Sequence, residues 1–505
     1  MSVVQSPLFE PVLWHDGGFK ILDEIQIPQK LEYLEVTEVA QALDAVREMK
    51  TRAFGQVLTF LYSAALVARN YRGAEAAPLR GQLQQLTQQF CEARPTFDFR
   101  GLGASVDGFF EKLSAGADVG ATIASQAREF GQQIVRGRRG RAKRAAAILA
   151  NPARVLTHCN VSGELVAVAA YCQELGKEFS VIATETRPYL QGARLTAWEL
   201  AQASVKVSLI ADCAVARVIA GGEVNAVIVG ADRVAQNGDV INKVGTYPLA
   251  RMAKEYGVPF HALVQDPRSL ARGADVPIEE RPADELLTFH GRSLVAGNNG
   301  QLKVRYPSFD MTPAEYITHL VGFDGLFTPE SFRQKYQAVA AVDSRSPQAS
   351  GKYLLIYGVP PPSQYAFLLS ALKAERAESI LVPEMRPELW GARVVAAELL
   401  KRNAPTTLIA DNMMGTLFAH GEITKLCFFY DSLAAAGPQG ICGSLLAVQL
   451  ACLHGVPIEL FSGDERKELT TDRDVSTFLG EPICPAGVAV RSSGPEVVPW
   501  VLFKG

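Results

Sequence analysis

Apolar residues recur at three- and four-residue spacings along residues 36–144, as in VTEVAQALDAVREMKTRAFGQVLTFLYSAALVARN. This period places apolar side chains on one face of a helix. Strand signals, which alternate every second residue, are few in this region. We therefore expect residues 1–145 to form a mainly helical N-terminal domain.

After residue 145 the pattern changes to short β-rich runs that alternate with amphipathic helical stretches. Such alternation predicts a parallel, doubly wound, Rossmann-like α/β domain over residues 146–339. The runs expected to form strands in and around its core are VLTH (155–158), SVIAT (180–184), VSLIA (207–211), AVIVG (226–230) and FHALV (260–264).

A polar segment at residues 340–350 is typical of a linker, and after it the chain repeats itself. ETRPYLQGARLTAWEL, from Glu185, returns as EMRPELWGARVVAAELL, from Glu384. The same offset relates Asp232 to Asp431 without a gap. We expect residues 351–505 to form a degenerate second copy of the Rossmann-like domain.

The segment AVIVGADRVAQNGDVINKVGTYPLA, residues 226–250, begins as a buried strand and turns abruptly polar. Ligands of an open α/β sheet bind beyond the carboxyl ends of its strands. Asp232, Asn242 and Lys243 are therefore candidate site residues. Cys159 follows the run VLTH in the same way and is a further candidate.

The repeat allows structural positions to be separated from candidate site positions. Positions retained in both copies, such as the E-x-R-P motif, are more economically explained as structural. Asp232 is retained as Asp431, so this comparison leaves its catalytic and structural interpretations about equally open. The candidates restricted to the first copy are Cys159 (aligned with Gly358), Gln191 (with Trp390) and Asn242-Lys243 (with Ile441-Cys442).

These residue types suit acid–base chemistry on an anionic ligand. A cysteine at a strand end is usually a small buried hydrophobe. Amides of a following helix, however, are expected to lower the pKa of Cys159 and favour a thiolate that acts as a base or nucleophile. An apolar approach is expected to raise the pKa of Asp232, as a general acid requires. Lys243, Asn242 and Gln191, with arginines from the helical domain, are expected to hold a sugar phosphate during proton-transfer isomerisation.

Motifs for several other chemistries are absent. No Walker loop, HExxH, GxSxG or zinc-type Cys/His spacing occurs, and no GxGxxG follows the first strand of either copy. We therefore expect no metal and no cofactor. The formal net charge of -3 argues against nucleic acid as the main partner. The basic run RGRRGRAKR (136–144) is interpreted as a solvated face, with an anionic partner as the minor alternative.

The sequence also bears on where the protein works. Its first residues lack a secretory signal pattern, and no apolar run is long enough to span a membrane. The 8 cysteines include no CxxC pair. We expect a cytoplasmic protein with reduced thiols and no membrane partner.

Taken together, the motifs resemble one known family. THCN (157–160), ETRPYLQGARLTAWEL, GADRVAQNGDVINKVGTY, VPIEER (276–281) and YPSFDMTPAEYIT (306–318) are similar to the methylthioribose-1-phosphate isomerase family. That family belongs to a superfamily with the regulatory subunits of the translation initiation exchange factor. The resemblance covers about residues 13–335 and implies a short β opening before the helices.

The resemblance implies an isomerase that converts 5-methylthioribose 1-phosphate to 5-methylthioribulose 1-phosphate in methionine salvage. It assigns proton transfer to Cys159 and the acid role to Asp232. Substrate contacts are assigned to Arg52, Arg94, Gln191, Asn242 and Lys243. The resemblance also implies a homodimer, or a pseudo-dimer in which the second α/β domain takes the place of a partner.

Two departures from the family pattern leave a related pentose 1-phosphate open as the substrate. Ala53 and Phe54 follow Arg52 where the family has a glycine-rich loop, which is expected to crowd the phosphate. Val161-Ser162-Gly163 follows THCN where the family has Thr-Gly, so the entrance to the next helix is expected to differ. The alternative function is a non-catalytic sugar-phosphate or nucleotide sensor, or an assembly protein like the exchange-factor subunits.

Overall fold

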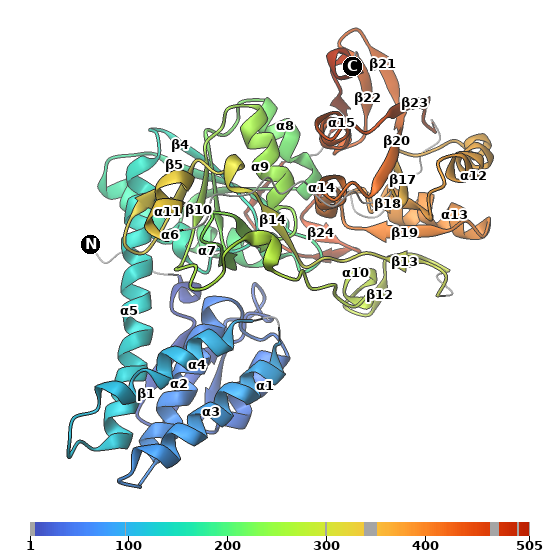
Figure 1. Ribbon diagram of the computed structural model, residues 1–505. Coiled ribbons are helices and arrows are strands. Elements are labelled where there is room, and N and C mark those ends of the chain that lie inside the picture. The colour runs from blue at the N-terminus through green and yellow to red at the C-terminus, as the bar shows by residue number, and fades with distance from the viewer. Residues whose placement is uncertain are drawn as a thin grey trace.

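The computed structural model describes residues 6–95, 97–297, 300–337, 351–464, 474–491 and 494–503. Figure 1 shows a helical region at one end of the molecule, a first α/β sheet in the middle and a second α/β sheet at the other end. The expected linker at 340–350 lies outside the described residues. None of the described helices is long and apolar enough to cross a membrane.

In the N-terminal region, a small antiparallel sheet precedes a group of helices whose core is formed by α2 and α5. Gly131 of α5 lies so close to α2 that a Cβ atom there would be 3.1 Å from Leu58. Helix α5 is 30 residues long and continues past the expected boundary at residue 145, so it reaches the first sheet. The elements are β1 (Val12–His15), β2 (Gly18–Leu22), β3 (Tyr33–Val36), α1 (Val39–Arg47), α2 (Phe54–Asn70), α3 (Ala76–Ala93), α4 (Phe99–Asp107) and α5 (Val119–Ile148).

The basic run at residues 136–144 is not simply the solvated face that its composition suggested. It lies on α5, where Arg138 and Arg141 are buried and both donate to the carboxylate of Glu164, at 2.8 Å. The guanidinium of Arg138 also stacks on the ring of Phe54, 4.0 Å from its centroid. A buried ion pair needs such partners, so these two arginines tie the helical region to the first sheet.

The first sheet has the strand order β16-β15-β10-β7-β4-β5-β6-β26. From β4 the chain moves outward to β5 and β6, then crosses to β7 and continues to β10 and β15. These strands are parallel, so the sheet is doubly wound with its switch point between β4 and β7. The strands are β4 (Ala153–Thr157), β5 (Phe179–Thr184), β6 (Lys206–Ile210), β7 (Ala226–Gly230), β10 (Phe260–Leu263), β15 (His319–Val321), β16 (Leu326–Phe327) and β26 (Ala489–Val490).

Helices connect these strands, and a smaller antiparallel sheet, β14-β9-β8, lies beside them. The helices are α6 (Glu164–Glu174), α7 (Ala197–Gln202), α8 (Val215–Ala220), α9 (Thr246–Glu255), α10 (Asp284–Leu287) and α11 (Pro329–Lys335). The strands of the smaller sheet are β8 (Arg233–Val234), β9 (Val240–Lys243) and β14 (Phe309–Thr312).

The second sheet has the order β13-β19-β18-β17-β20-β23 and is also parallel. Its strands are β13 (Lys303–Val304), β17 (Tyr353–Tyr357), β18 (Ser379–Pro383), β19 (Thr406–Ile409), β20 (Ile423–Tyr430) and β23 (Ile458–Ser462). The helices around it are α12 (Tyr365–Ala374), α13 (Ala397–Lys401), α14 (Met414–Ala419) and α15 (Ser444–Leu453). A further small sheet joins β21 (Ser432–Ala434), β22 (Gly437–Gly440) and β27 (Glu496–Val497).

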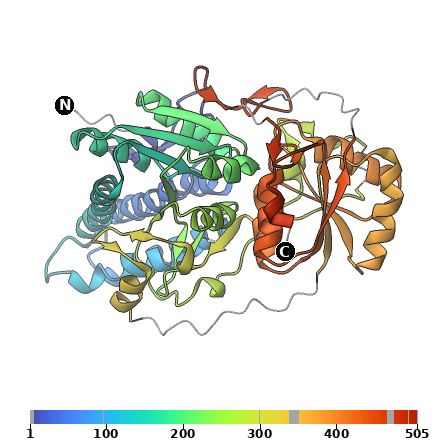
Figure 2. The same ribbon diagram turned by 90° about the horizontal axis from the view of Figure 1, so that it is seen from above.

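The two sheets exchange edge strands. β13 precedes the second sheet in the chain but pairs with its edge strand β19, whereas β26 follows the second sheet and pairs with β6 of the first. Two hairpins meet between the sheets, β11 (Thr288–Phe289) with β12 (Arg292–Ser293) and β24 (Thr477–Phe478) with β25 (Glu481–Pro482); the rings of Phe289 and Phe478 lie 5.3 Å apart. Figure 2 shows the red segments of the last part of the chain reaching across to the first sheet.

Comparison of the loops after Asp232 and Asp431 corrects the expected alignment of the two sheets at Asn242 and Lys243. The amide of Asp232 donates to Ile241, and the amide of Asp431 donates to Gln439, so the second loop is one residue shorter. The glycines that precede α9 and α15, Gly245 and Gly443, are offset in the same way. The structural counterparts of Asn242 and Lys243 are therefore Gly440 and Ile441, not Ile441 and Cys442.

Candidate active site

Cys159 and Asp232 follow two neighbouring parallel strands. β4 ends at Thr157 and β7 ends at Gly230, and these strands pair side by side at the switch point. Both residues therefore lie beyond the carboxyl edge of the first sheet, where open α/β sheets bind ligands. Burial, and after it the negative charge of Asp232, raises the pKa of the Cys159 thiol, so the two groups interact electrostatically.

The turn around Cys159 corrects the expectation of a lowered thiol pKa. Helix α6 begins only at Glu164, after Gly163 as N-cap, so its amides do not directly follow Cys159. Burial, and then the charge of Asp232, raises the pKa of the Cys159 thiol to about 11. The residue has a φ of 65°, and this conformation is fixed by hydrogen bonds from its amide to Thr186 (2.9 Å) and from Thr196 to its carbonyl (2.7 Å).

The neighbouring His158 is a buried structural residue rather than an acid–base group. Burial lowers its pKa to about 4, so its ring is neutral at neutral pH. Nε2 lies 2.8 Å from the carbonyl of Val244, and Nδ1 lies 2.7 Å from the hydroxyl of Thr184. With Nε2 as the donor, Thr184 donates to Nδ1. His158 thereby ties the end of β4 to the loop after β9.

Asp232 has the raised pKa that its sequence context predicted. The side chain remains open to solvent, yet the surrounding protein atoms partly desolvate the carboxyl group and raise its pKa to about 6. The positive charges of Arg94 and Lys243 oppose this rise. An exposed carboxyl group partly surrounded by protein is suited to exchanging protons with a bound ligand near neutral pH.

Lys243 and Asn242 end strand β9 in buried positions. Burial lowers the pKa of the Lys243 ammonium to about 8, and its Nζ donates to the hydroxyl of Tyr306 at 3.1 Å. Asn242 donates to Thr246 at 2.9 Å. The turn that follows is held by Asp310, which accepts from the amide of Gly245 at 2.7 Å.

Arg52 and Arg94 are contributed by the helical region. Arg52 precedes α2 and stacks on Tyr189, 4.7 Å from the ring centroid, while Lys243 lies 5.7 Å from the same ring. The Nε atoms of Arg52 and Arg94 are buried without a hydrogen-bond partner among the described residues. Buried donors normally have partners, so both guanidinium groups retain capacity for an anionic ligand.

Ala53 and Phe54, which follow Arg52, differ in whether they disturb this loop. Ala53 has a φ of 40°, in the region that favours glycine. Phe54, expected to crowd the phosphate, is instead buried under Arg138. The strain at Ala53 is therefore the remaining local departure in this loop.

Gln191 lies at the end of the turn that contains Arg187 and Tyr189. The turn is tight, because a Cβ on Gly192 would lie 1.7 Å from the carbonyl oxygen of Thr184. Gln191 is buried, and its Oε1 has no hydrogen-bond partner among the described residues. It therefore adds a third unsatisfied polar group, after Arg52 and Arg94, in the elements that carry the predicted site residues.

Two tyrosines that no sequence pattern marks as functional organise this site. Tyr189 donates to Glu285 at 2.5 Å and accepts from Arg281 at 3.2 Å, which fixes the ring under Arg52. Tyr306 fixes Lys243. Both tyrosines occur in or beside quoted motifs, but a tyrosine carries no periodic signal that separates such a role from packing. Among the described residues, no group of three or more His, Cys, Asp or Glu side chains could hold a metal ion.

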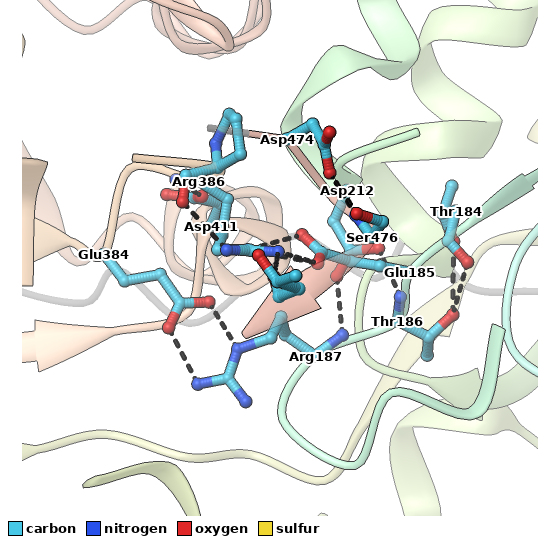
Figure 3. A network of polar contacts seen from close by, with 12 residues as sticks. Thr184, Glu185, Thr186, Arg187, Asp212, Glu384, Arg386, Asp411, Asp474 and Ser476 are labelled. Atoms are coloured by element: carbon cyan, nitrogen blue, oxygen red, sulfur yellow. Dashed lines mark hydrogen bonds and ion pairs between the residues drawn. The ribbon is translucent and has the colours of Figure 1, made fainter. Parts of the chain in front are cut away.

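A buried polar network joins the two sheets directly behind this site. Figure 3 shows Arg187 paired with Glu384, and Arg386 paired with Glu185. Each closest contact is 2.8 Å, so the arginine of each E-x-R-P motif binds the glutamate of the other. Asp212 accepts from the amides of Thr186 and Arg187 at 2.7 Å, and Asp411 accepts from Met385 and Arg386 in the same way.

Comparison with known proteins places the chain among relatives of defined type. Residues 56–329 and 349–435 match the Initiation factor 2 subunit family. The chain is 36% identical over 324 residues to a methylthioribose-1-phosphate isomerase of Albidiferax ferrireducens, covering 61% of this chain and 90% of the relative. It is 33% identical over 353 residues to a 5-deoxyribose 1-phosphate isomerase of Moorella thermoacetica, covering 66% and 98%.

Two solved structures are also similar. The 5-methylthioribose 1-phosphate isomerase of Pyrococcus horikoshii matches with a TM-score of 0.57 and 28% identity, over 67% of this chain and 98% of that one. The delta subunit of translation initiation factor eIF-2B from A. fulgidus matches with a TM-score of 0.56 and 33% identity, over 65% and 98%.

Proposed function

The chain belongs to the initiation factor 2 subunit family, and we propose that it is an aldose–ketose isomerase acting on 5-methylthioribose 1-phosphate. Its product is 5-methylthioribulose 1-phosphate, which makes it an enzyme of methionine salvage. The observation that carries the proposal is the combination of Cys159 and Asp232 beyond adjacent strands with unsatisfied Arg52, Arg94 and Gln191 groups. That combination is what an acid–base site for a phosphorylated sugar requires.

Arg52, Arg94 and Lys243 would hold the phosphate and its sugar. Arg52 and Lys243 both lie beside the ring of Tyr189, so their positive charges repel each other. A bound anion would relieve this repulsion. Asn242 and Gln191 supply amide groups for the sugar hydroxyls. A phosphate dianion next to Asp232 would raise the pKa of that carboxyl group further above 6, so that it stays protonated when substrate is bound.

Asp232 is then the proton donor that opens the sugar ring. A phosphate on C1 prevents the ring from opening as a free hemiacetal, so the ring oxygen must receive a proton as its bond to C1 breaks. Hydrogen moves from C2 to C1, and the C2 hydroxyl becomes the ketone and releases its own proton. Substrate and product are isomers, and this released proton restores the one that Asp232 gave.

The raised pKa of Cys159 changes the role expected from the sequence. With a pKa of about 11, the resting thiol is protonated at neutral pH and is not a ready base. We assign it instead to hydrogen-bond donation to the substrate's C2 oxygen, which gains negative charge as its hydroxyl releases the proton. Its fixed turn, held by Thr186 and Thr196, supports such a positioned donor.

The proposal is tested by a turnover assay with purified protein. Ketose formation is followed with 5-methylthioribose 1-phosphate, 5-deoxyribose 1-phosphate and ribose 1-phosphate for the wild type, Asp232→Asn and Cys159→Ser. We expect the highest kcat/KM with the methylthio sugar and a loss of about 10²–10⁴-fold in Asp232→Asn. Absence of wild-type turnover with all three sugars would exclude the enzyme.

The second candidate function is a sugar-phosphate or nucleotide sensor, supported by the similarity to the eIF-2B delta subunit and by the strained Ala53. The same purified protein distinguishes the two. Calorimetric binding of a sugar phosphate, together with absence of turnover, would favour the sensor. Turnover lost in Asp232→Asn, with binding retained, would favour the isomerase.

We also propose that the second sheet is a degenerate internal repeat that serves as a built-in partner for the first. Its support is the reciprocal set of contacts between the sheets: exchanged edge strands and crossed arginine–glutamate pairs. A contact surface that is already filled within one chain does not need a second copy. We expect a monomer of 54.6 kDa by sedimentation. We also expect no turnover from the second sheet once both site residues of the first are replaced, in Cys159→Ala with Asp232→Asn.

A further inference from the structure

Asn412 belongs to the second sheet but reaches the turn behind Cys159. It lies in the short helical turn after β19 and is buried. Its Nδ2 donates to Oδ2 of Asp212 at 2.9 Å and to the carbonyl of Arg187 at 3.0 Å. Its Oδ1 accepts from no described residue, so the side chain acts here only as a donor.

A chain of hydrogen bonds connects Asn412 to Cys159 through Asp212 and Thr186. Asp212 accepts from the amide of Thr186 at 2.7 Å, and the hydroxyl of Thr186 accepts from the amide of Cys159 at 2.9 Å. Asn412 also closely approaches the loop that carries Lys243, because a Cβ placed on Gly245 would lie 2.9 Å from its Cβ. Asn412 therefore holds the turn behind Cys159 by hydrogen bonds and lies close beside the loop that carries Lys243.

The position that corresponds to Asn412 in the first sheet is Cys213, which follows Asp212 as Asn412 follows Asp411. Cys213 performs the reciprocal contact: its Sγ lies 3.6 Å from the carbonyl of Arg386. A thiol is a weak donor with one hydrogen, whereas the Asn412 amide makes two hydrogen bonds. The stronger hydrogen bonds, from Asn412, thus hold the turn beside Cys159, and the weaker one, from Cys213, holds the turn beside Gly358.

We propose that Asn412 is a positioning residue supplied by the second sheet to the active site of the first, and that this site is incomplete without it. The inference rests on the proposed isomerase function. It gives a specific task in the reaction to the second sheet, which has Gly358, Trp390 and Ile441 in place of Cys159, Gln191 and Lys243. A brace of this kind acts by holding the reacting groups in place, where an error of about 1 Å costs about 10²-fold in rate.

The test compares Asn412→Ala and Asn412→Cys with the matched control Cys213→Ala. Asn412→Cys introduces the residue that the equivalent position already accommodates, so it is expected to fold even if Asn412→Ala does not. We expect both Asn412 variants to lower kcat at least tenfold with KM within about threefold, and Cys213→Ala to keep kcat within about twofold. Equal losses at the two positions, or an unchanged kcat per folded molecule in the Asn412 variants, would overturn the proposal.

A second measurement keeps this test independent of the isomerase proposal. The rate of iodoacetamide alkylation at Cys159, read by peptide mass spectrometry, reports the position of the thiol without any substrate. We expect that rate to change severalfold in the Asn412 variants and to stay unchanged in Cys213→Ala. If the wild type turns over no sugar phosphate but this pattern holds, the proposed reaction fails and the positioning role stands. Equal alkylation rates in all proteins would overturn the positioning role.

Discussion

Removing Glu384 should strongly destabilise the joint between the two sheets. The carboxylate accepts two hydrogen bonds from Arg187, both at 2.8 Å, and the two side chains are 0% and 2% exposed. Charge-assisted hydrogen bonds contribute about 1.5–3 kcal/mol each, and breaking a buried pair by removing one partner costs about 3–5 kcal/mol. We therefore expect Glu384→Ala to lower the free energy of unfolding by about 3–5 kcal/mol. This is a large part of the roughly 5–15 kcal/mol that stabilises a typical domain.

Urea unfolding, followed by tryptophan fluorescence, measures this loss as a shift of the midpoint. The control is Glu398→Ala, because Glu398 pairs with Lys401 and Arg402 near the surface, where such pairs contribute about 0–1 kcal/mol. Replacing both buried partners, in Arg187→Met with Glu384→Leu, should recover most of the stability. If Glu384→Ala costs no more than Glu398→Ala, the ion pair is not what holds the sheets together.

Three further predictions concern the site. kcat/KM should fall as the pH rises through about 6, where free Asp232 loses the proton it must donate, and fall more steeply above about 8, where Lys243 loses its charge; a profile that rises over this range would refute the acid role. Ala53→Gly should relieve the positive φ and raise stability by about 1 kcal/mol in thermal unfolding, and a lower melting temperature would contradict the strain. Tyr189→Leu should raise KM about tenfold by removing the ring beneath Arg52, whereas Tyr189→Phe should stay within about threefold; equal effects would show that the ring face is not what matters.

The strands were predictable because buried parallel strands leave contiguous apolar runs. AVIVG coincides with β7, and VLTH overlaps β4 by all but its last residue. The same logic located Cys159 and Asp232 beyond the carboxyl edge of the sheet. Their roles there remain proposals, because position alone does not determine which group gives a proton.

What could not be predicted depends on contacts between distant residues. The composition of the basic run predicts a solvated face because it does not reveal Glu164, which lies after the run in the chain and neutralises two of its arginines. The prediction of a lowered pKa for Cys159 is wrong because the sequence does not reveal that helix α6 starts only at Glu164. The positions of the second sheet that align with Asn242 and Lys243 are displaced by one residue, since a loop that is shorter by one residue leaves little trace in two segments of low similarity.

The exchange of edge strands has a consequence for how the protein is made on the ribosome. β6, laid down early, presents an open edge until β26 emerges near the end of synthesis. Unpaired edges invite pairing with other chains. The nascent polypeptide therefore exposes an unpaired strand edge while residues 211–488 are being synthesised. The need for chaperones should be greatest during this interval.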